Sequence, residues 1–204
     1  MLYLVSNCYD WIGYHLVTTL LENGCHVEGI GDTSSQKQEH LSMFFARNDL
    51  FTEVSKPKTK EYDVAYLIGD DDLETDAKAK RTVRLNDSKK SRNHNQDTLN
   101  IKLPLLFGEW MPMNEEGIYD GDEFISFDST NFQTNAIHVE DFMKSLLQWT
   151  KSTNIATELE VFSEKNKDRK EIKLENSIFL RDNIPMDESL EKVKSHYKQF
   201  RKFY

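Results

Sequence analysis

The N-terminal third of the chain alternates short apolar runs with amphipathic segments, and this alternation restricts the fold more than any other feature. Four apolar runs have the length and composition of buried strands, at residues 2–5, 27–30, 50–54 and 64–68. Between them, residues 12–21 and 36–47 carry apolar side chains at helical spacing, and Gly24 supplies a stop after the first helix. Strands that alternate with helices favour a parallel sheet covered by helices, so we predict an α/β fold.

The middle of the chain is more polar. An acidic cluster at residues 70–76 precedes a run of basic residues, and Val83 and Leu85 predict one short strand there. The stretch 86–100 is almost wholly polar and is predicted to be a loop. We therefore expect the sheet to be truncated in the middle of the chain.

Apolar periodicity resumes in the second half of the chain. The predicted elements are a strand at 101–107, a helix at 137–149, strands at 158–163 and 171–175, and a helix from Asp187. We expect residues 1–110 to form the core. Residues 111–204 are expected to pack on that core as late elements and a small C-terminal α/β extension, within one compact unit.

Composition excludes several classes of partner. The chain has 204 residues, a net charge of −9 and a pI of about 5.2, so it lacks the basic surface that nucleic-acid phosphates require. No apolar stretch approaches membrane-spanning length, and we expect no membrane association. Cys8 and Cys25 are the only cysteines. They make no disulfide framework, and we expect a reducing, cytoplasmic setting.

The first predicted strand, turn and helix carry a recognisable motif. Residues 5–17 run Val-Ser-Asn-Cys-Tyr-Asp-Trp-Ile-Gly-Tyr-His-Leu-Val. This string resembles the opening V-T-G-A-A-G-F-I-G-S-H-L-V of the extended short-chain dehydrogenase/reductase family, the NAD(P)-dependent sugar epimerases and dehydratases. Three further stretches resemble that family in the same order: 62–69 its fourth strand, 102–108 its R-L-P-N-V-Y-G strand, and 137–141 its I-H-V-D-D segment. The resemblance implies a Rossmann-like parallel sheet flanked by helices.

The resemblance also implies a dinucleotide site on the first turn, in altered form. Asn7 and Asp10 stand where the family has its first two glycines, and only the third, Gly13, remains. Asp10 would oppose a diphosphate by its bulk and its charge. The acidic residue that holds the ribose aligns with Gly31, one position before Asp32. The vestigial site predicted in this way comprises Ser6, Asn7, Asp10, Trp11, Ile12, Gly13, Asp32 and Gly69. We expect no cofactor, with NAD(P) as the alternative if the altered turn still binds it.

The family's catalytic residues are not found in this sequence. The family uses Tyr-x-x-x-Lys on a central helix, and no tyrosine here has a lysine four residues later. Tyr197 with Arg201 comes nearest, on the last helix. Leu67 stands where the fourth strand usually has His, and the segment between Leu85 and Ile101 is too short and too polar to hold the catalytic helix. We expect no catalytic residue and a pseudoenzyme.

The missing helix has a structural consequence. In the family it covers part of one sheet face and contributes to the dimer interface. Its loss would expose apolar strand surface, which the polar middle segment or another chain must cover. We therefore predict that the protein binds itself or another protein through this surface, as an oligomer or in a complex.

Other candidate residues have plainer explanations. The six histidines match no metal-ligand spacing, and we predict no metal site. His138 with Glu140 and Asp141 could act in acid–base chemistry, but a role at the start of a helix is favoured. Cys8 could be activated by a helix N-terminus, but an inert thiol is favoured. A solvated surface is likewise favoured for the acidic cluster and for the basic residues of the last helix.

Three functions are consistent with this pattern. The leading interpretation is a non-catalytic Rossmann-like protein that acts by binding a small ligand or a protein, in a regulatory or scaffolding role. The first alternative is an NAD(P)-dependent sugar-nucleotide epimerase, dehydratase or reductase with an atypical cofactor loop. The second is a purely structural oligomer without a ligand.

Overall fold

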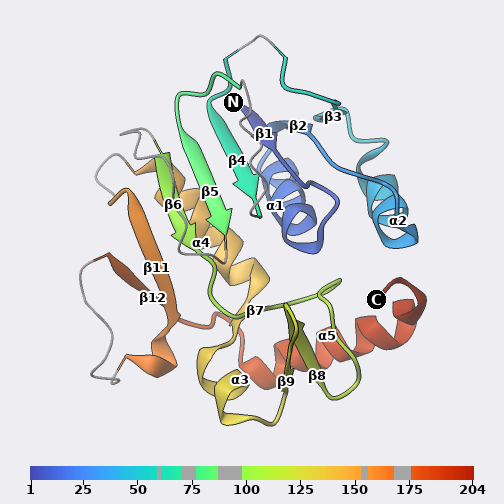
Figure 1. Ribbon diagram of the computed structural model, residues 1–204, viewed down its shortest axis with the longest axis vertical. Helices are drawn as coiled ribbons and strands as arrows, with labels where there is room; N and C mark the ends of the chain where they lie inside the picture. Colours follow the sequence, from blue (N-terminus) through green and yellow to red (C-terminus); the bar gives the residue numbers. More distant parts are fainter. Residues whose placement is uncertain (59–60, 70–76, 87–97, 153–155, 168–175) are drawn as a thin grey trace.

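Eight parallel strands form the central sheet of the computed structural model, which describes residues 1–58, 61–69, 77–86, 98–152, 156–167 and 176–204. Their order across the sheet is β12-β11-β6-β5-β4-β1-β2-β3 (Figure 1). The strands are β1 (Leu2–Val5), β2 (His26–Gly29), β3 (Phe51–Glu53), β4 (Val64–Ile68), β5 (Thr82–Asn86), β6 (Thr98–Lys102), β11 (Glu158–Ser163) and β12 (Ser177–Leu180). The predicted α/β fold with a parallel sheet is confirmed. The order reverses direction between β1 and β4, which is the switch point of a doubly wound sheet.

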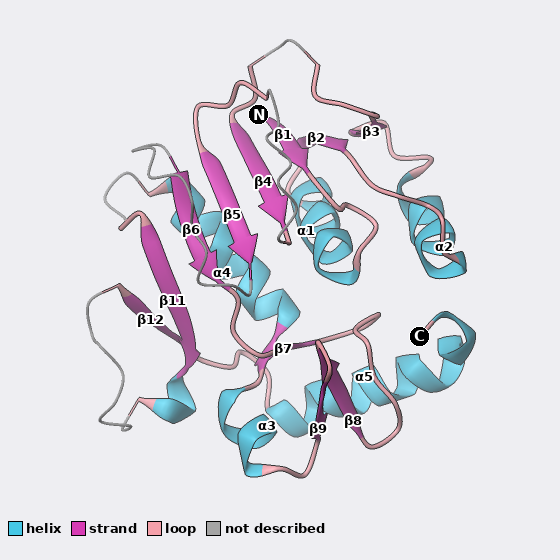
Figure 2. Cartoon of the chain, in the orientation of Figure 1, coloured by secondary structure: helices cyan, strands magenta, loops and turns pink. Residues whose placement is uncertain are grey.

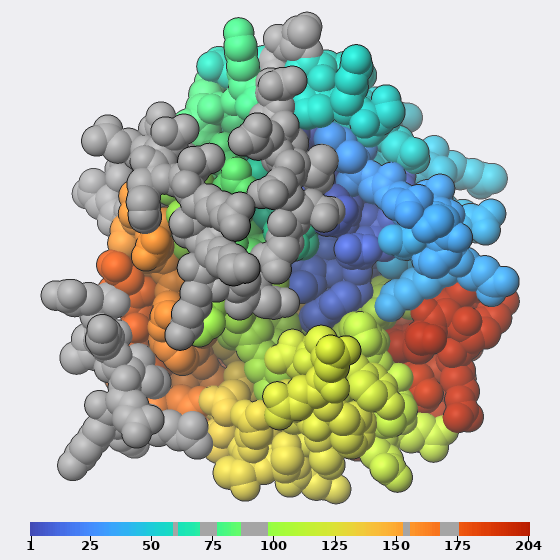
Figure 3. Space-filling view, viewed as in Figure 1, coloured from blue at the N-terminus to red at the C-terminus, as the bar shows by residue number. Residues whose placement is uncertain are grey.

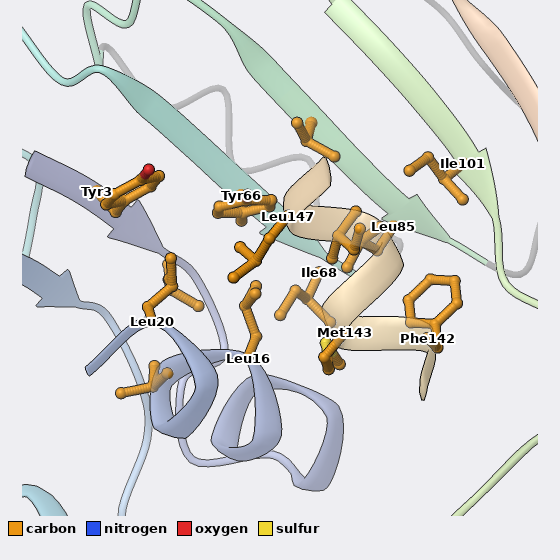
Figure 4. Close-up of a cluster of buried hydrophobic side chains, with 14 of the residues drawn as sticks. Tyr3, Leu16, Leu20, Tyr66, Ile68, Leu85, Ile101, Phe142, Met143 and Leu147 are labelled. Atoms are coloured by element: carbon orange, nitrogen blue, oxygen red, sulfur yellow. The ribbon is translucent and has the colours of Figure 1, made fainter. Parts of the chain in front are cut away.

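Two helices cover one face of the sheet. α1 (Trp11–Glu22) and α4 (Val139–Lys151) lie side by side behind the strands in Figures 1 and 2. Alternate strand residues meet them, because side chains along a strand point to opposite faces. Figure 4 shows Tyr66 and Ile68 of β4 facing Leu16 of α1 and Met143 of α4. This contact forms the main hydrophobic core.

The opposite face of the sheet has a different character. Near β1 and β4 it carries Leu4 and Ala65, which pack with Val54 and Tyr62 in a smaller buried cluster. Towards β5, β6 and β11 the residues of this face are polar, namely Thr82, Arg84, Asn100, Glu158 and Glu160. Among the described residues, no helix lies in the connections β4–β5 and β5–β6.

The second half of the chain builds a separate hydrophobic cluster below the sheet. It consists of the strand pair β7 (Leu106–Phe107) and β10 (Ile137–His138), the hairpin of β8 (Gly117–Asp120) and β9 (Glu123–Ser126), α3 (Thr130–Asn135) and α5 (Met186–Phe200). Phe107, Phe132, Met186 and Val193 are buried at its centre. β11 and β12 return to the central sheet, so the two halves of the chain share it.

Several predicted elements need correction. The predicted strand at 101–107 is two strands, because Pro104 has no N–H for a sheet and separates β6 from β7. The predicted loop over 86–100 is wrong at its ends, where β5 finishes and β6 begins. β6 is polar, but pairing with β5 and β11 outweighs its composition. The acidic cluster at 70–76, the predicted strand at 171–175 and most of the segment that lacks the catalytic helix lie outside the described residues.

The β8–β9 hairpin was not expected from the sequence, although a signal for it exists. Asp120 pairs with Glu123 across a two-residue turn at Gly121, whose φ is 59°. A two-residue turn with glycine at its first position, here Gly121-Asp122, is a recognised hairpin signal, because glycine adopts a positive φ without strain. Among the described helices, none is long and apolar enough to cross a membrane.

Candidate crevice at the first turn

The turn between β1 and α1 keeps a left-handed residue at Asn7, although the first two glycines of the resembled motif are absent. Asn7 adopts a φ of 49°, the left-handed conformation that favours glycine, and asparagine is one of the residues that tolerates it. Its side-chain amide donates to the Ile68 carbonyl at 2.7 Å, and the Ser6 hydroxyl accepts from the Ile68 backbone N–H at 2.9 Å. The turn is therefore tied to the end of β4 by side chains.

Gly13 is required for the packing of α1 against this turn. A Cβ atom at Gly13 would lie 2.0 Å from the Asn7 carbonyl oxygen. No shift of a flexible side chain relieves a contact with backbone. The role inferred for the third glycine, close packing of helix and strand, therefore agrees with the geometry at this position.

Asp10 occupies the N-terminal end of α1. It is the N-cap residue, but its side chain makes no capping hydrogen bond. Its carboxylate instead accepts from the side-chain amide of Gln38 at 3.2 Å. Gln38 belongs to α2 (Gln36–Phe45), which begins with a capping box between Ser35 and Gln38. The carboxylate is exposed and stands where a diphosphate would approach the first N–H groups of α1.

A crevice of about 410 Å³ opens between this turn, the start of α2 and the ends of the central strands. This volume is within the range of small-molecule sites. The lining combines polar groups at one end with an apolar wall. It comprises Tyr9, Asp10, Trp11, Ile12, Ser35, Lys37, Gln38, Ile68, Gly69, Asn86, Leu103 and Pro112.

Tyr9 fills the space beside the end of β2. Its ring is buried, its hydroxyl donates to the Glu53 carboxylate at 2.7 Å, and it packs against Phe45 and Phe51. A Cβ atom at Gly31 would lie 2.6 Å from the Tyr9 ring. A side chain at Gly31, the position that aligns with the family's ribose-binding acid, has no room.

Asp32 does not replace that acid. It is exposed and accepts hydrogen bonds from the backbone N–H and the hydroxyl of Ser34, at 3.0 and 2.5 Å. It is not among the residues that line the crevice. A one-residue shift of the loop therefore does not bring its carboxylate to the predicted place.

Lys37 brings a positive charge to the crevice. Its ammonium donates to the Trp110 backbone carbonyl and lies 5.6 Å from the centre of the Tyr204 ring. Burial lowers its pKa to about 8, although the nearby Asp10 carboxylate acts in the opposite direction. The sequence offered no signal that Lys37 would reach the site.

Two smaller hollows continue the crevice towards the second half of the chain. The first, of about 140 Å³, shares Trp11, Ile12, Leu103 and Pro112 with the crevice. The second, of about 270 Å³, continues past Leu105 and Asp120 to β11. Three carboxylates line this extension, from Asp120, Glu123 and Glu160, against one ammonium, from Lys102. The lining is acidic on balance.

The remaining residues that align with motifs of the resembled family have structural roles. Leu67 stands at the His position of its fourth strand and Phe107 at the Tyr position of its R-L-P-N-V-Y-G strand, and both side chains are buried. Asp141 of the late motif is also buried and accepts from the backbone and side-chain nitrogens of Asn183, at 3.1 and 2.6 Å. It therefore ties the start of α4 to the segment before α5. Burial raises the pKa of the Cys8 thiol to about 12, so the turn does not activate it.

The structure therefore brings together half of the predicted site residues. Asp10, Trp11, Ile12 and Gly69 line the crevice. Ser6, Asn7 and Gly13 shape the turn behind it, and Asp32 lies apart. Within the described part of the chain, no cluster of three or more His, Cys, Asp or Glu residues could hold a metal ion.

Comparison with solved structures shows in which proteins this fold recurs. The structure of Pal from Bacillus thuringiensis matches with a TM-score of 0.64 at 10% identity, over 98% of this chain and 99% of that chain. The dTDP-glucose 4,6-dehydratase of Bacillus anthracis, in complex with NAD, matches with a TM-score of 0.63 at 7% identity, over 100% and 98%. The UDP-glucuronic acid 4-epimerase of Bacillus cereus, also in complex with NAD, matches with 0.60 at 13%, over 98% and 99%. The chain shares the Rossmann-like fold of these epimerase and dehydratase structures.

The likeness concerns the fold, because the identities are low. The sequence matches no protein-family model and no curated protein. In an extended short-chain dehydrogenase/reductase fold, a dinucleotide lies across the carboxyl ends of the strands at the switch point. The crevice of this chain lies at that place. Its residues do not fit a dinucleotide held by the first turn, since Asp10 opposes the diphosphate and Tyr9 leaves no room for an acid at Gly31.

Proposed function

We propose that this protein is a non-catalytic member of its fold class that binds a small, phosphate-free ligand in the crevice at the first turn. The single observation that carries the proposal is the placement of Asp10. Its carboxylate is oriented by Gln38 at the N-terminus of α1, on the wall of a crevice of about 410 Å³. The crevice is open, yet a carboxylate stands where a diphosphate would bind. This combination favours binding of a different ligand over a crevice without any ligand.

The electrostatics support a neutral or cationic ligand. Two unit charges of like sign 4 Å apart repel by about 1 kcal/mol in water, and by more where water is excluded. Asp10 imposes this repulsion on a diphosphate, and the acidic lining of the two adjoining hollows adds to it. Lys37 supplies the one positive charge among the described residues that line the crevice, and its ammonium already donates to the Trp110 carbonyl.

The absence of redox catalysis is supported by the sequence and by the packing. No Tyr-x-x-x-Lys is present to supply a phenolate base. Leu67 and Phe107 place buried apolar side chains at positions where the resembled family has polar groups. These replacements leave the two positions without a group that could move a proton at a substrate carbinol.

Calorimetric titration with NAD⁺, NADH, NADP⁺ and NADPH tests this proposal. We expect no heat from the wild-type protein up to millimolar cofactor. Asp10→Gly removes the carboxylate and its bulk and should bind at least about tenfold more tightly, the factor that corresponds to about 1.4 kcal/mol. Asp32→Gly is the matched control, because Asp32 lies outside the crevice and its loss should not change the titration.

A phosphate-free probe tests the positive part of the proposal. Adenosine and ADP differ in the diphosphate alone, and NMR reports which amides each one perturbs. Adenosine should shift the amide signals of Ile12 and Gly69 in the wild-type protein, whereas ADP should shift them in Asp10→Gly only. If neither molecule shifts them in either protein, ligand binding in the crevice is contradicted.

A dinucleotide-dependent enzyme is the second candidate function. Asn7 favours it, because this residue keeps the positive φ that the first glycine of such a turn would adopt. Micromolar binding of any of the four dinucleotides by the wild-type protein would place this function first. Turnover of a sugar nucleotide would then decide between an enzyme and a cofactor sensor.

We also propose that a second copy or another protein contacts the sheet face away from α1 and α4. Arg84, Asn100 and Glu160 make this face polar around β5, β6 and β11. We therefore expect hydrogen bonds and ion pairs there instead of the apolar contact expected from the sequence. If the protein stays monomeric in mass photometry at both low and high salt concentration, the proposal that it binds a second copy is contradicted. The cytoplasmic setting stays a prediction.

A further inference from the structure

The C-terminal residues of the chain pack against α2 through a cluster of rings. Figure 1 shows the end of α5 beside α2, and Figure 3 shows the C-terminal surface against that of α2. Within this cluster His40 stacks on Phe203 with ring centres 4.0 Å apart, and Trp110 stacks on Tyr204 at 5.8 Å. We call residues 200–204 the strap. It joins the second half of the chain to the first at the edge of the crevice.

A chain of hydrogen bonds runs through the same contact. The Tyr204 hydroxyl accepts from the Trp110 backbone N–H at 2.8 Å and lies 2.6 Å from Nδ1 of His196. The Trp110 carbonyl in turn accepts from the Lys37 ammonium. The backbone of Trp110 is therefore held at its N–H by Tyr204 of the strap and at its carbonyl by Lys37 of the crevice wall.

The segment around Trp110 is strained and depends on these contacts. Trp110 is buried at a φ of 67°, a conformation that a bulky residue rarely adopts unless its surroundings impose it. Pro112, two residues later, lines both the crevice and the adjoining hollow. A loss of the strap would remove the Tyr204 stack and hydrogen bond from Trp110, although the Tyr14 and His40 rings also contact it. We expect the strained segment to loosen then, and Pro112 and Lys37 to move with it.

We propose that the strap closes the outer side of the crevice, and that its release opens the crevice to ligand. The inference rests on the proposed function, since a gate matters only where something binds. Lys37 and Pro112 are the wall residues that the strap controls, through Trp110. Tyr204 is a positioning residue, because it acts on the wall through the Trp110 backbone.

Tyr204→Phe tests the strap with the least change of shape. The ring over Trp110 and Lys37 stays, and only the hydroxyl that joins Trp110 to His196 is lost. Amide hydrogen exchange of residues 109–111 should accelerate by about tenfold, the factor that corresponds to the loss of one ordinary hydrogen bond. Acetylation of Lys37 by a water-soluble N-hydroxysuccinimide ester, followed by mass spectrometry, should rise by a similar factor, because the reagent must enter the crevice to react.

Tyr197→Phe is the matched control. Tyr197 lies on α5 next to His196 and its ring contacts that of Tyr204, but its hydroxyl takes no part in the hydrogen-bond chain. Its exchange and labelling pattern should equal that of the wild type. Phe203→Ala, which removes the stack on His40, should open the strap by an independent route and raise Lys37 acetylation.

The two readouts separate the possible outcomes. Unchanged amide exchange at residues 109–111 in Tyr204→Phe would overturn the strap itself. Faster exchange without faster Lys37 acetylation would overturn its role as a gate. Neither readout uses a ligand, so failure of the proposed function would appear in the titrations alone.

Discussion

Tyr9 and Gly31 face each other so closely that position 31 has no room for a side chain while the Tyr9 ring is present. The Tyr9 ring is buried against Gly31, where a Cβ atom would lie 2.6 Å from it. The ring belongs to the turn that opens α1, and Gly31 follows β2. The ring therefore occupies the space that a side chain would need at Gly31, the position that aligns with the ribose-binding acid of the resembled family.

A double-mutant cycle should measure this relationship. Gly31→Asp should lower the free energy of unfolding by about 1–3 kcal/mol, the usual range for overpacking. Tyr9→Ser removes the ring and leaves a cavity, at a loss of about 3–5 kcal/mol. The double variant should be more stable than the sum of the two changes indicates, because the new Asp side chain enters the vacated space. Urea unfolding of the four proteins gives the coupling, and simple additivity would contradict the contact.

Gly13 and Gly24 should respond very differently to alanine. At Gly13 a Cβ atom would lie 2.0 Å from a backbone oxygen, so Gly13→Ala should destabilise the protein by several kcal/mol or prevent folding. At Gly24 nothing lies within 4 Å, and the φ of 70° alone opposes alanine. Gly24→Ala should therefore lower stability by only about 1 kcal/mol. Equal melting temperatures for the two variants would show that the turn is less rigid than its geometry indicates.

The two cysteines should differ in reactivity. Cys8 is buried, and burial raises the pKa of its thiol to about 12, so almost no thiolate forms at neutral pH. Cys25 is partly exposed. A thiol-reactive disulfide reagent should label Cys25 alone in the folded protein and both thiols in denaturant. Rapid labelling of Cys8 in native Cys25→Ser would contradict its burial.

Lys37 should make stability rise with pH in a defined window. Its pKa in the folded protein is about 8, below the ordinary value of 10.5, because burial opposes its charge. Between these two values the unfolded chain binds more protons than the folded one, and stability therefore increases with pH. Urea unfolding at pH 8 and pH 9.5 should show this increase, and Lys37→Met should reduce the slope. A slope that Lys37→Met leaves unchanged would assign the effect to other groups.

The fold was largely predictable because its signals are local. Short apolar runs, helical spacing and the string at residues 5–17 all depend on neighbours in the chain, and they place β1, α1 and β4 correctly. The later strands were harder. Pro104 separates β6 from β7, and β6 is polar enough to resemble a loop until its two partner strands are known.

The candidate site was predictable only in part, for a physical reason. The sequence by itself determined that Asp10 stands where the resembled family has a glycine and that no Tyr-x-x-x-Lys exists, since both depend on residue identity. Only the tertiary structure decided that Tyr9 fills the space beside Gly31, that Gln38 orients Asp10, and that Lys37 meets Trp110. These contacts join residues far apart in the chain or held on different elements. Their distances depend on how the helices pack on the sheet, which no local pattern records.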